Sequence, residues 1–139
     1  VLRPFKPKTF SKPAFLRSST RRSLPASRFD MAVAHIQPRE LRAWLDDTDR
    51  VKPVLLDVRE PWEINLCAID GANRIPMGTI PQQMKQLDPD AEIVVICHHG
   101  ARSMQVAAFL DRNGFAHLHN LTGGVDAWAR EIDPSMQLY

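Results

Sequence analysis

Cysteine is scarce in this sequence, and long apolar runs are absent from it. Only two cysteines, Cys67 and Cys97, occur among the 139 residues. This number excludes a framework of several disulfides and fits a reducing compartment. No apolar run approaches the roughly 20 residues that a membrane-spanning helix needs. We therefore expect no membrane partner.

The remaining composition is typical of one globular domain. Apolar residues make up 44% and charged residues 24% of the chain, and both values are ordinary for a soluble protein. A chain of 139 residues can bury a core without disulfide staples. We expect a monomer, although the sequence does not determine the oligomeric state.

Acidic residues are almost missing from the first 30 residues. This segment carries eight Lys or Arg against a single acid, Asp30, together with four prolines and five serines. It has no apolar periodicity, so we expect residues 1–30 to form a disordered basic extension. The extension is sequence upstream of a natural start at Met31, a mitochondrial or plastid transit peptide, or a functional arm. The first alternative corresponds to the cytoplasmic location that we expect.

Residues 31–139 carry the opposite charge balance, with ten basic and fifteen acidic side chains. A nucleic-acid-binding domain is expected to have a basic stripe on its folded part. We therefore expect no nucleic-acid partner.

Short β-rich runs alternate with helical runs along residues 31–139. Strands are predicted at residues 34–36, 54–58, 73–75, 93–97 and 117–121. Helices are predicted at residues 38–46, 61–66, 80–87, 102–113 and 125–132, with Thr79 as the cap of the third. This alternation predicts an α/β domain with a mostly parallel sheet.

The most apolar strand ends at Cys97, and a short loop follows before Arg102 opens a helix. The loop contains His98, His99, Gly100 and Ala101, and Ser103 follows in the helix. In open α/β sheets, ligands bind beyond the carboxyl ends of the strands. Loop N–H groups and the positive end of the helix dipole stabilise an anion there. A cysteine that ends a buried strand is more often a packing residue, but this loop favours a nucleophilic thiolate at Cys97.

Several stretches, in this order, resemble the rhodanese homology domain over roughly residues 36–132. They are Leu56-Asp57-Val58-Arg59, with Glu60 and Glu63; Gly71-Ala72-Asn73-Arg74-Ile75-Pro76-Met77-Gly78; Cys97–Arg102; and Leu121-Thr122-Gly123-Gly124, with Ala127-Trp128. The resemblance implies a central five-stranded, mostly parallel sheet with helices on both faces. It also implies a loop that forms a persulfide on Cys97.

This resemblance implies a thiosulfate:cyanide sulfurtransferase-like enzyme. Cys97 accepts a sulfane sulfur from a donor of the thiosulfate or polysulfide class and passes it to a thiol or cyanide-like acceptor, which is a small molecule or a protein. Arg102 supports the catalytic loop, and Asp57 and Arg59 are expected behind it. The spacing is Cys-x4-Arg, as in the sulfurtransferases; the related phosphatases have Cys-x5-Arg, because phosphate needs a wider ring of amides.

Two alternatives remain open. The first alternative is a non-catalytic module that binds partners or senses sulfur or oxidation, although the presence of Cys97 favours the enzyme. Cys67 is a second functional thiol or a neutral substitution in the family pattern. No cofactor and no metal are expected, because adjacent His98 and His99 do not have a usual ligand spacing. The physiological donor, acceptor and pathway stay undetermined.

Overall fold

The computed structural model describes residues 33–139 of the chain. The extension predicted for residues 1–30 lies outside the described residues. Within them, five strands form one sheet in the order β1-β5-β4-β2-β3, and every pairing is parallel. The predicted α/β architecture with a five-stranded parallel sheet is confirmed.

The strands lie within one or two residues of the predicted ranges. They are β1 (Val33–Ile36), β2 (Val54–Asp57), β3 (Asn73–Arg74), β4 (Glu92–Ile96) and β5 (His117–Leu121). The central strand β4 pairs with β2 and β5, and its last four residues are fully buried. A continuous apolar run such as Ile-Val-Val-Ile is typical of a parallel strand that is covered on both faces.

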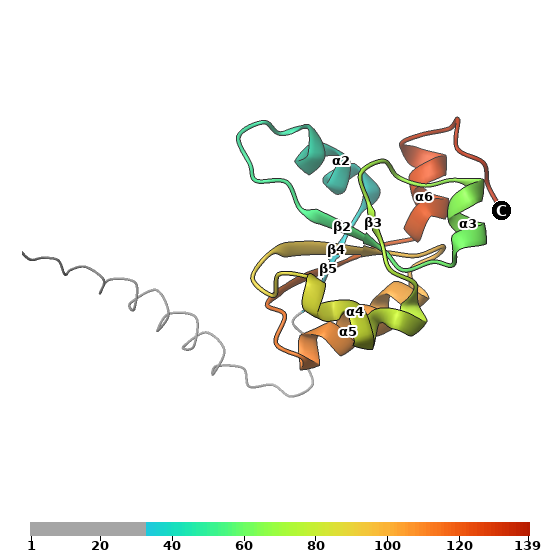
Figure 1. Ribbon diagram of the computed structural model, residues 1–139. Coiled ribbons are helices and arrows are strands. Elements are labelled where there is room, and N and C mark those ends of the chain that lie inside the picture. Colours follow the sequence, from blue (N-terminus) through green and yellow to red (C-terminus); the bar gives the residue numbers. More distant parts are fainter. Residues whose placement is uncertain (1–32) are drawn as a thin grey trace, which may run out of the picture. The chain divides into compact units, whose positions relative to one another are not determined.

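The helices are α2 (Pro38–Asp46), α3 (Pro61–Leu66), α4 (Ile80–Gln83), α5 (Ala101–Arg112) and α6 (Gly124–Glu131). Figure 1 shows α4 and α5 on one side of the sheet and α2 and α6 on the other. Two apolar clusters result. One joins Ile93, Val95 and Leu110 on the α5 side, and the other joins Val94 and Trp128 on the α6 side.

The helix predicted at residues 80–87 is wrong in length and in its cap. The structure has α4 followed by a short 3-10 helix, Met84–Gln86. Thr79 does not cap α4, because its hydroxyl donates to the Pro76 carbonyl and Thr79 itself ends the 3-10 helix Met77–Thr79. The segment has four α-helical residues and no side-chain cap.

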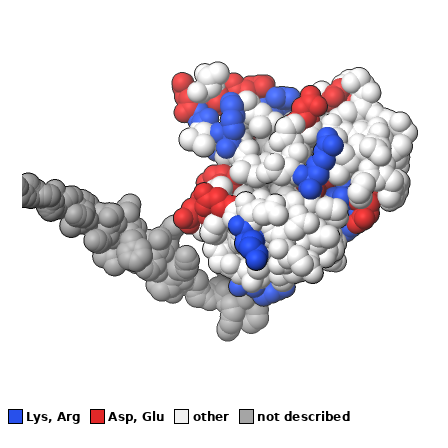
Figure 2. Space-filling model, viewed as in Figure 1, with Lys and Arg blue, Asp and Glu red and all other residues white. Residues whose placement is uncertain are grey.

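Charges are scattered over the surface of the described residues. On the face shown in Figure 2, the basic side chains are separated by neutral surface and by acidic groups. Within residues 33–139, none of the helices has the length and apolar character of a membrane span.

Candidate functional site

Cys97 lies directly after β4 and is only 1% exposed. Its Sγ accepts a hydrogen bond from the backbone N–H of Gly100 at 3.0 Å. Gly100 has a φ of +111°, a conformation that glycine adopts without strain, and it is the cap residue before α5. The sulfur therefore lies within a tight turn between a strand and the N-terminus of a helix.

Hydrogen bonds through the side chains of Ser103 and Asn120 hold the groups around this sulfur. The Ser103 hydroxyl lies 3.2 Å from Cys97 Sγ and donates to the Asn120 side-chain oxygen. The Asn120 amide group also donates to the carbonyl of Gly100 at 3.3 Å. Asn120 thus holds both groups that contact the sulfur, from the neighbouring strand β5.

The start of α6 holds the carbonyl side of the loop. The N–H of Val125 donates to the Cys97 carbonyl at 2.9 Å, and the N–H of Asp126 donates to the His98 carbonyl at 3.1 Å. This approach is possible only because residue 124 is glycine. A Cβ on Gly124 would lie 2.3 Å from the Cys97 carbonyl oxygen.

The Arg102 guanidinium pairs with Glu63 of α3. Its two terminal nitrogens donate to the two carboxylate oxygens at 2.7 and 2.8 Å. Glu63 is 3% exposed. The hydrogen bond from Arg102 holds the pKa of Glu63 far below its usual value, at about 2. Arg102 therefore contributes as an anchor of α5 to α3, and its charge is largely balanced by this pair.

Asp57 and Arg59 form a second, deeper ion pair. Arg59 is 0% and Asp57 1% exposed, and they are joined at 2.7 and 2.9 Å. Arg59 also donates to the Cys67 carbonyl and to the hydroxyl of Tyr139, at 2.9 and 3.0 Å. These contacts join the end of β2 to α3 and to the C-terminal residues. Both residues support the region behind the loop, and neither contacts the sulfur.

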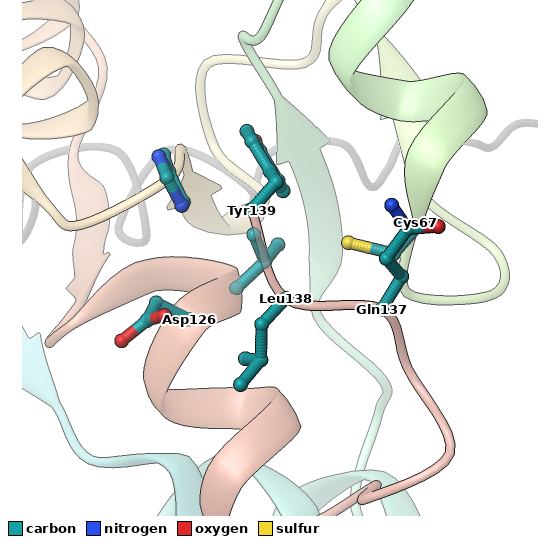
Figure 3. Close-up of a pocket in the computed structure, with 7 residues that line it drawn as sticks. Cys67, Asp126, Gln137, Leu138 and Tyr139 are labelled. Carbon is teal, nitrogen blue, oxygen red and sulfur yellow. The ribbon is translucent and has the colours of Figure 1, made fainter.

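Tyr139 connects the two ion pairs. Its hydroxyl donates to Glu63 at 2.9 Å and accepts from Arg59, and its burial raises its pKa to about 12. Its ring stacks on His98 at 3.8 Å between centroids. The Trp62 ring meets the Tyr139 ring edge-on, with 6.1 Å between centroids. Figure 3 shows residues 137–139 passing between Cys67 and Asp126 at a small recess. Trp62 is 61% exposed, so it flanks the loop region on the solvent side.

Of the residues predicted for the loop and the start of the helix, Gly100 and Ser103 contact the Cys97 sulfur. His98 stacks on Tyr139, and His98 and His99 lie beside each other and near Asp126. Sequence patterns missed the roles of Asn120, Glu63 and Tyr139. For Asn120 there was a usable signal, because it occupies a buried position on the same side of β5 as Leu118. Within residues 33–139, one set of three possible metal ligands is found, His98, His99 and Asp126.

Comparison with known proteins gives a consistent result. Residues 37–131 match the rhodanese-like domain family. A sulfurtransferase of Allochromatium vinosum is 40% identical over 98 residues, which is 70% of this chain and 90% of that protein. The crystal structure of SSP1007 from Staphylococcus saprophyticus has a TM-score of 0.65 and 30% identity, and covers 75% of this chain and 98% of that one.

A longer relative contains the same domain as a part. The probable adenylyltransferase/sulfurtransferase MoeZ of Mycobacterium tuberculosis is 39% identical over 106 residues. The match covers 75% of this chain and 26% of that protein. The chain therefore spans about a quarter of the length of this relative.

Proposed function

Because the chain belongs to the rhodanese-like domain family, we propose that it is a sulfurtransferase in which Cys97 carries a sulfane sulfur as a persulfide. The observation that carries the proposal is the position of Cys97 Sγ, which accepts the Gly100 N–H and contacts the Ser103 hydroxyl at the N-terminus of α5. Dipoles fixed around a sulfur atom stabilise negative charge on it without reorganisation. Several relatives are named sulfurtransferases, including the Allochromatium protein, and this supports the same interpretation.

In the first half-reaction, the Cys97 thiolate attacks the outer sulfur of the donor. A bond forms between Cys97 Sγ and that sulfur, and the bond inside the donor breaks. With thiosulfate, sulfite leaves with the electron pair of the broken bond. Cys97 then holds a persulfide, and its charged terminal sulfur is stabilised by loop N–H groups.

The Ser103 hydroxyl has a defined part in this step. While it donates to Asn120, only its lone pairs face Cys97, so the cysteine S–H is the donor across the 3.2 Å contact. Once the thiol has lost its proton to solvent, the hydroxyl can turn and donate to the thiolate. Ser103 thereby stabilises both protonation states of the nucleophile.

In the second half-reaction, an acceptor thiolate or cyanide attacks the terminal sulfur of the persulfide. The S–S bond breaks and Cys97 leaves as the thiolate, so the enzyme returns to its first state. The two half-reactions predict ping-pong kinetics. Cys97 is 1% exposed, so each partner reaches the sulfur only after side chains near the loop move aside.

The test is a donor panel with cyanide as the common acceptor, combined with mass spectrometry of the protein after each donor. We expect Cys97 to gain the mass of one sulfur atom and lose it on addition of cyanide. Cys97→Ser is expected to lose all transfer while keeping its melting temperature. Cys67→Ser is the matched control and is expected to keep most activity. A protein that never gains sulfur from any donor would instead be a binding or sensing module.

A further inference from the structure

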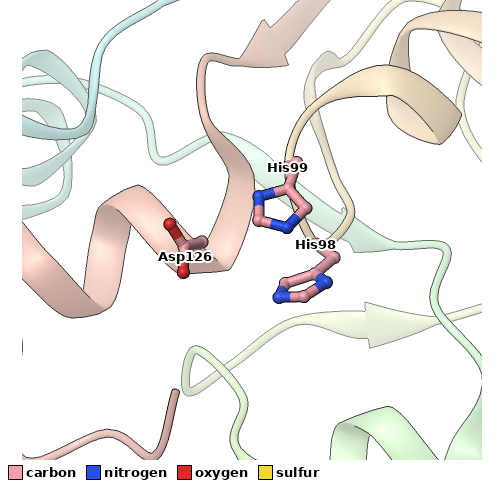
Figure 4. Close-up of side chains that lie close together, drawn as sticks. All are labelled: His98, His99 and Asp126. Atoms are coloured by element: carbon pink, nitrogen blue, oxygen red, sulfur yellow. The ribbon is translucent and has the colours of Figure 1, made fainter. Parts of the chain in front are cut away.

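Two histidines of the Cys97 loop lie beside a carboxylate from α6. His98 and His99 have ring centroids 3.8 Å apart, and Asp126 belongs to the first turn of α6 (Figure 4). One ligand atom from each of the three residues lies within 4.8 Å of the others. We propose that His98, His99 and Asp126 bind a divalent transition-metal ion such as Zn²⁺, which ties the loop to α6.

The geometry requires only a small closure. Zinc bonds of about 2.0–2.2 Å in a tetrahedral arrangement place ligand atoms about 3.4 Å from one another. The atoms must therefore approach by about 1.4 Å at most, starting from a separation of 4.8 Å. His99 is exposed and can rotate toward the ion. The backbone of Asp126 is already fixed against the loop, because its N–H donates to the His98 carbonyl.

His98 carries the most direct sign of a missing partner. Its Nε2 atom is buried and has no hydrogen-bond partner among the described residues. Leaving a buried polar atom unpaired is unfavourable, and a bound metal ion would satisfy it.

Arg130 competes with a metal ion for the Asp126 carboxylate, but this ion pair is exposed to solvent and is therefore easily displaced. Arg130 donates to the two carboxylate oxygens at 3.0 and 3.4 Å, and its side chain is 60% exposed. Exposed pairs of this kind contribute little to stability, because water and salt screen them. Two imidazoles and one carboxylate favour zinc, copper or nickel over magnesium or calcium. Three ligands leave at least one coordination position for water.

The sequence alone argues against this site, because adjacent histidines have no usual ligand spacing. The third ligand comes from a later helix, and only the packing of α6 against the loop brings it near. The other histidines are His35, His117 and His119, and residues 1–32 contain neither His nor Cys. His117 Nδ1 and His119 Nε2 lie 3.9 and 2.8 Å from the carboxylate oxygens of Glu92. These three residues serve as a control cluster of two histidines and one carboxylate.

The test is calorimetric titration of the full chain with Zn²⁺ at neutral pH, with the zinc-induced rise in melting temperature as a second readout. We expect one equivalent to bind and to raise the melting temperature. His99→Gln and Asp126→Asn are each expected to weaken binding at least tenfold. Arg130→Gln removes the competitor and is expected to bind at least as tightly as the unchanged protein.

Two controls separate this site from other ligands. His117→Gln and Cys97→Ser are expected to bind Zn²⁺ as the unchanged protein does. Equal binding by Asp126→Asn and the unchanged protein would overturn the proposal, as would loss of binding in either control. Absence of binding up to about 1 mM zinc, which corresponds to about 4 kcal/mol, would overturn it as well.

Discussion

The buried carboxylate of Glu63 accepts hydrogen bonds from three different residues. It accepts two hydrogen bonds from Arg102, one from Tyr139 and one from the N–H of Glu60. Glu63→Gln keeps the shape of the side chain but replaces one acceptor oxygen with an NH2 group. That group cannot accept from Arg102, so the guanidinium loses half of its paired contact. We expect the domain to be destabilised at neutral pH.

The size of the effect follows from the pKa. A carboxyl group whose pKa falls from 4.5 to about 2 on folding contributes about 3.4 kcal/mol, at about 1.4 kcal/mol for each pH unit. The Arg102 side chain is 35% exposed, so solvent screens part of this interaction. We therefore expect Glu63→Gln to lower the free energy of unfolding by about 2 kcal/mol, which corresponds to about 10 °C in melting temperature.

The contribution of Glu63 to the free energy of unfolding depends on pH in a direction that can be predicted. Because the folded pKa of Glu63 is lowered, its contribution is present above pH 4.5 and disappears as the pH falls toward 2. Urea unfolding of the two proteins measures this directly. The difference in unfolding free energy is expected to stay constant from neutral pH to about pH 5 and then to shrink steadily on further acidification.

Glu131→Gln, at the exposed end of α6, is the matched control for loss of one carboxylate. It is expected to leave the free energy of unfolding within about 0.5 kcal/mol. A Glu63→Gln difference that is equally large at acidic and neutral pH would show that lost packing, and not the Arg102 pair, is responsible. A difference below about 0.5 kcal/mol at neutral pH would refute the reasoning outright.

Two further substitutions and one insertion test the Cys97 loop. Asn120→Ala removes the acceptor of the Ser103 hydroxyl and the donor to the Gly100 carbonyl. We expect kcat/KM for sulfur transfer to fall about tenfold or more. The free energy of unfolding in urea is expected to fall by about 1–2 kcal/mol. Gly124→Ala places a Cβ 2.3 Å from the Cys97 carbonyl oxygen, and we expect a loss of about 3 kcal/mol or more in the same measurement. One glycine inserted between Gly100 and Ala101 moves the Gly100 N–H relative to the sulfur, and cyanolysis is expected to fall at least about tenfold.

The two substitutions have matched controls elsewhere in the chain. Asn113→Ala, at the exposed end of α5, is expected to retain full transfer activity. Gly78→Ala meets no atom within 4 Å and is expected to retain its stability. Transfer by Asn120→Ala at the unchanged rate would contradict its positioning role. An insertion variant that gains aryl phosphate hydrolysis and keeps full cyanolysis would contradict the argument from loop length.

Local patterns were sufficient for most of the fold. The boundaries predicted for α2, α3 and β5 agree with the structure, because each has a proline at its start or an apolar period of its own. The helix predicted at residues 80–87 is wrong in length, although Ile80, Met84 and Leu87 have the spacing of one helical face. Here the chain changes to 3-10 geometry after Gln83.

The site was less predictable, because its contacts join distant parts of the chain. The Cys97 loop is contiguous, so its residues could be named from the sequence. Arg102 could be named too, but its partner Glu63 is 39 residues away in the sequence, so the ion pair could not be predicted. Tyr139 contacts Arg59 and Glu63 only after the chain has returned from α6. No local pattern indicates contacts of this kind.

The strand order has a consequence for how the domain is made. Within the described residues, β1 (Val33–Ile36) pairs only with β5 (His117–Leu121). The first strand of the sheet therefore cannot pair until the last strand is available. Closing such a long loop is entropically unfavourable, and domains with non-local strand pairing fold slowly. On a translating ribosome, β1 therefore stays without its partner strand until β5 has emerged. We expect nascent chains that stop before residue 117 to expose the edges of both β1 and β4, and to depend on chaperones for solubility.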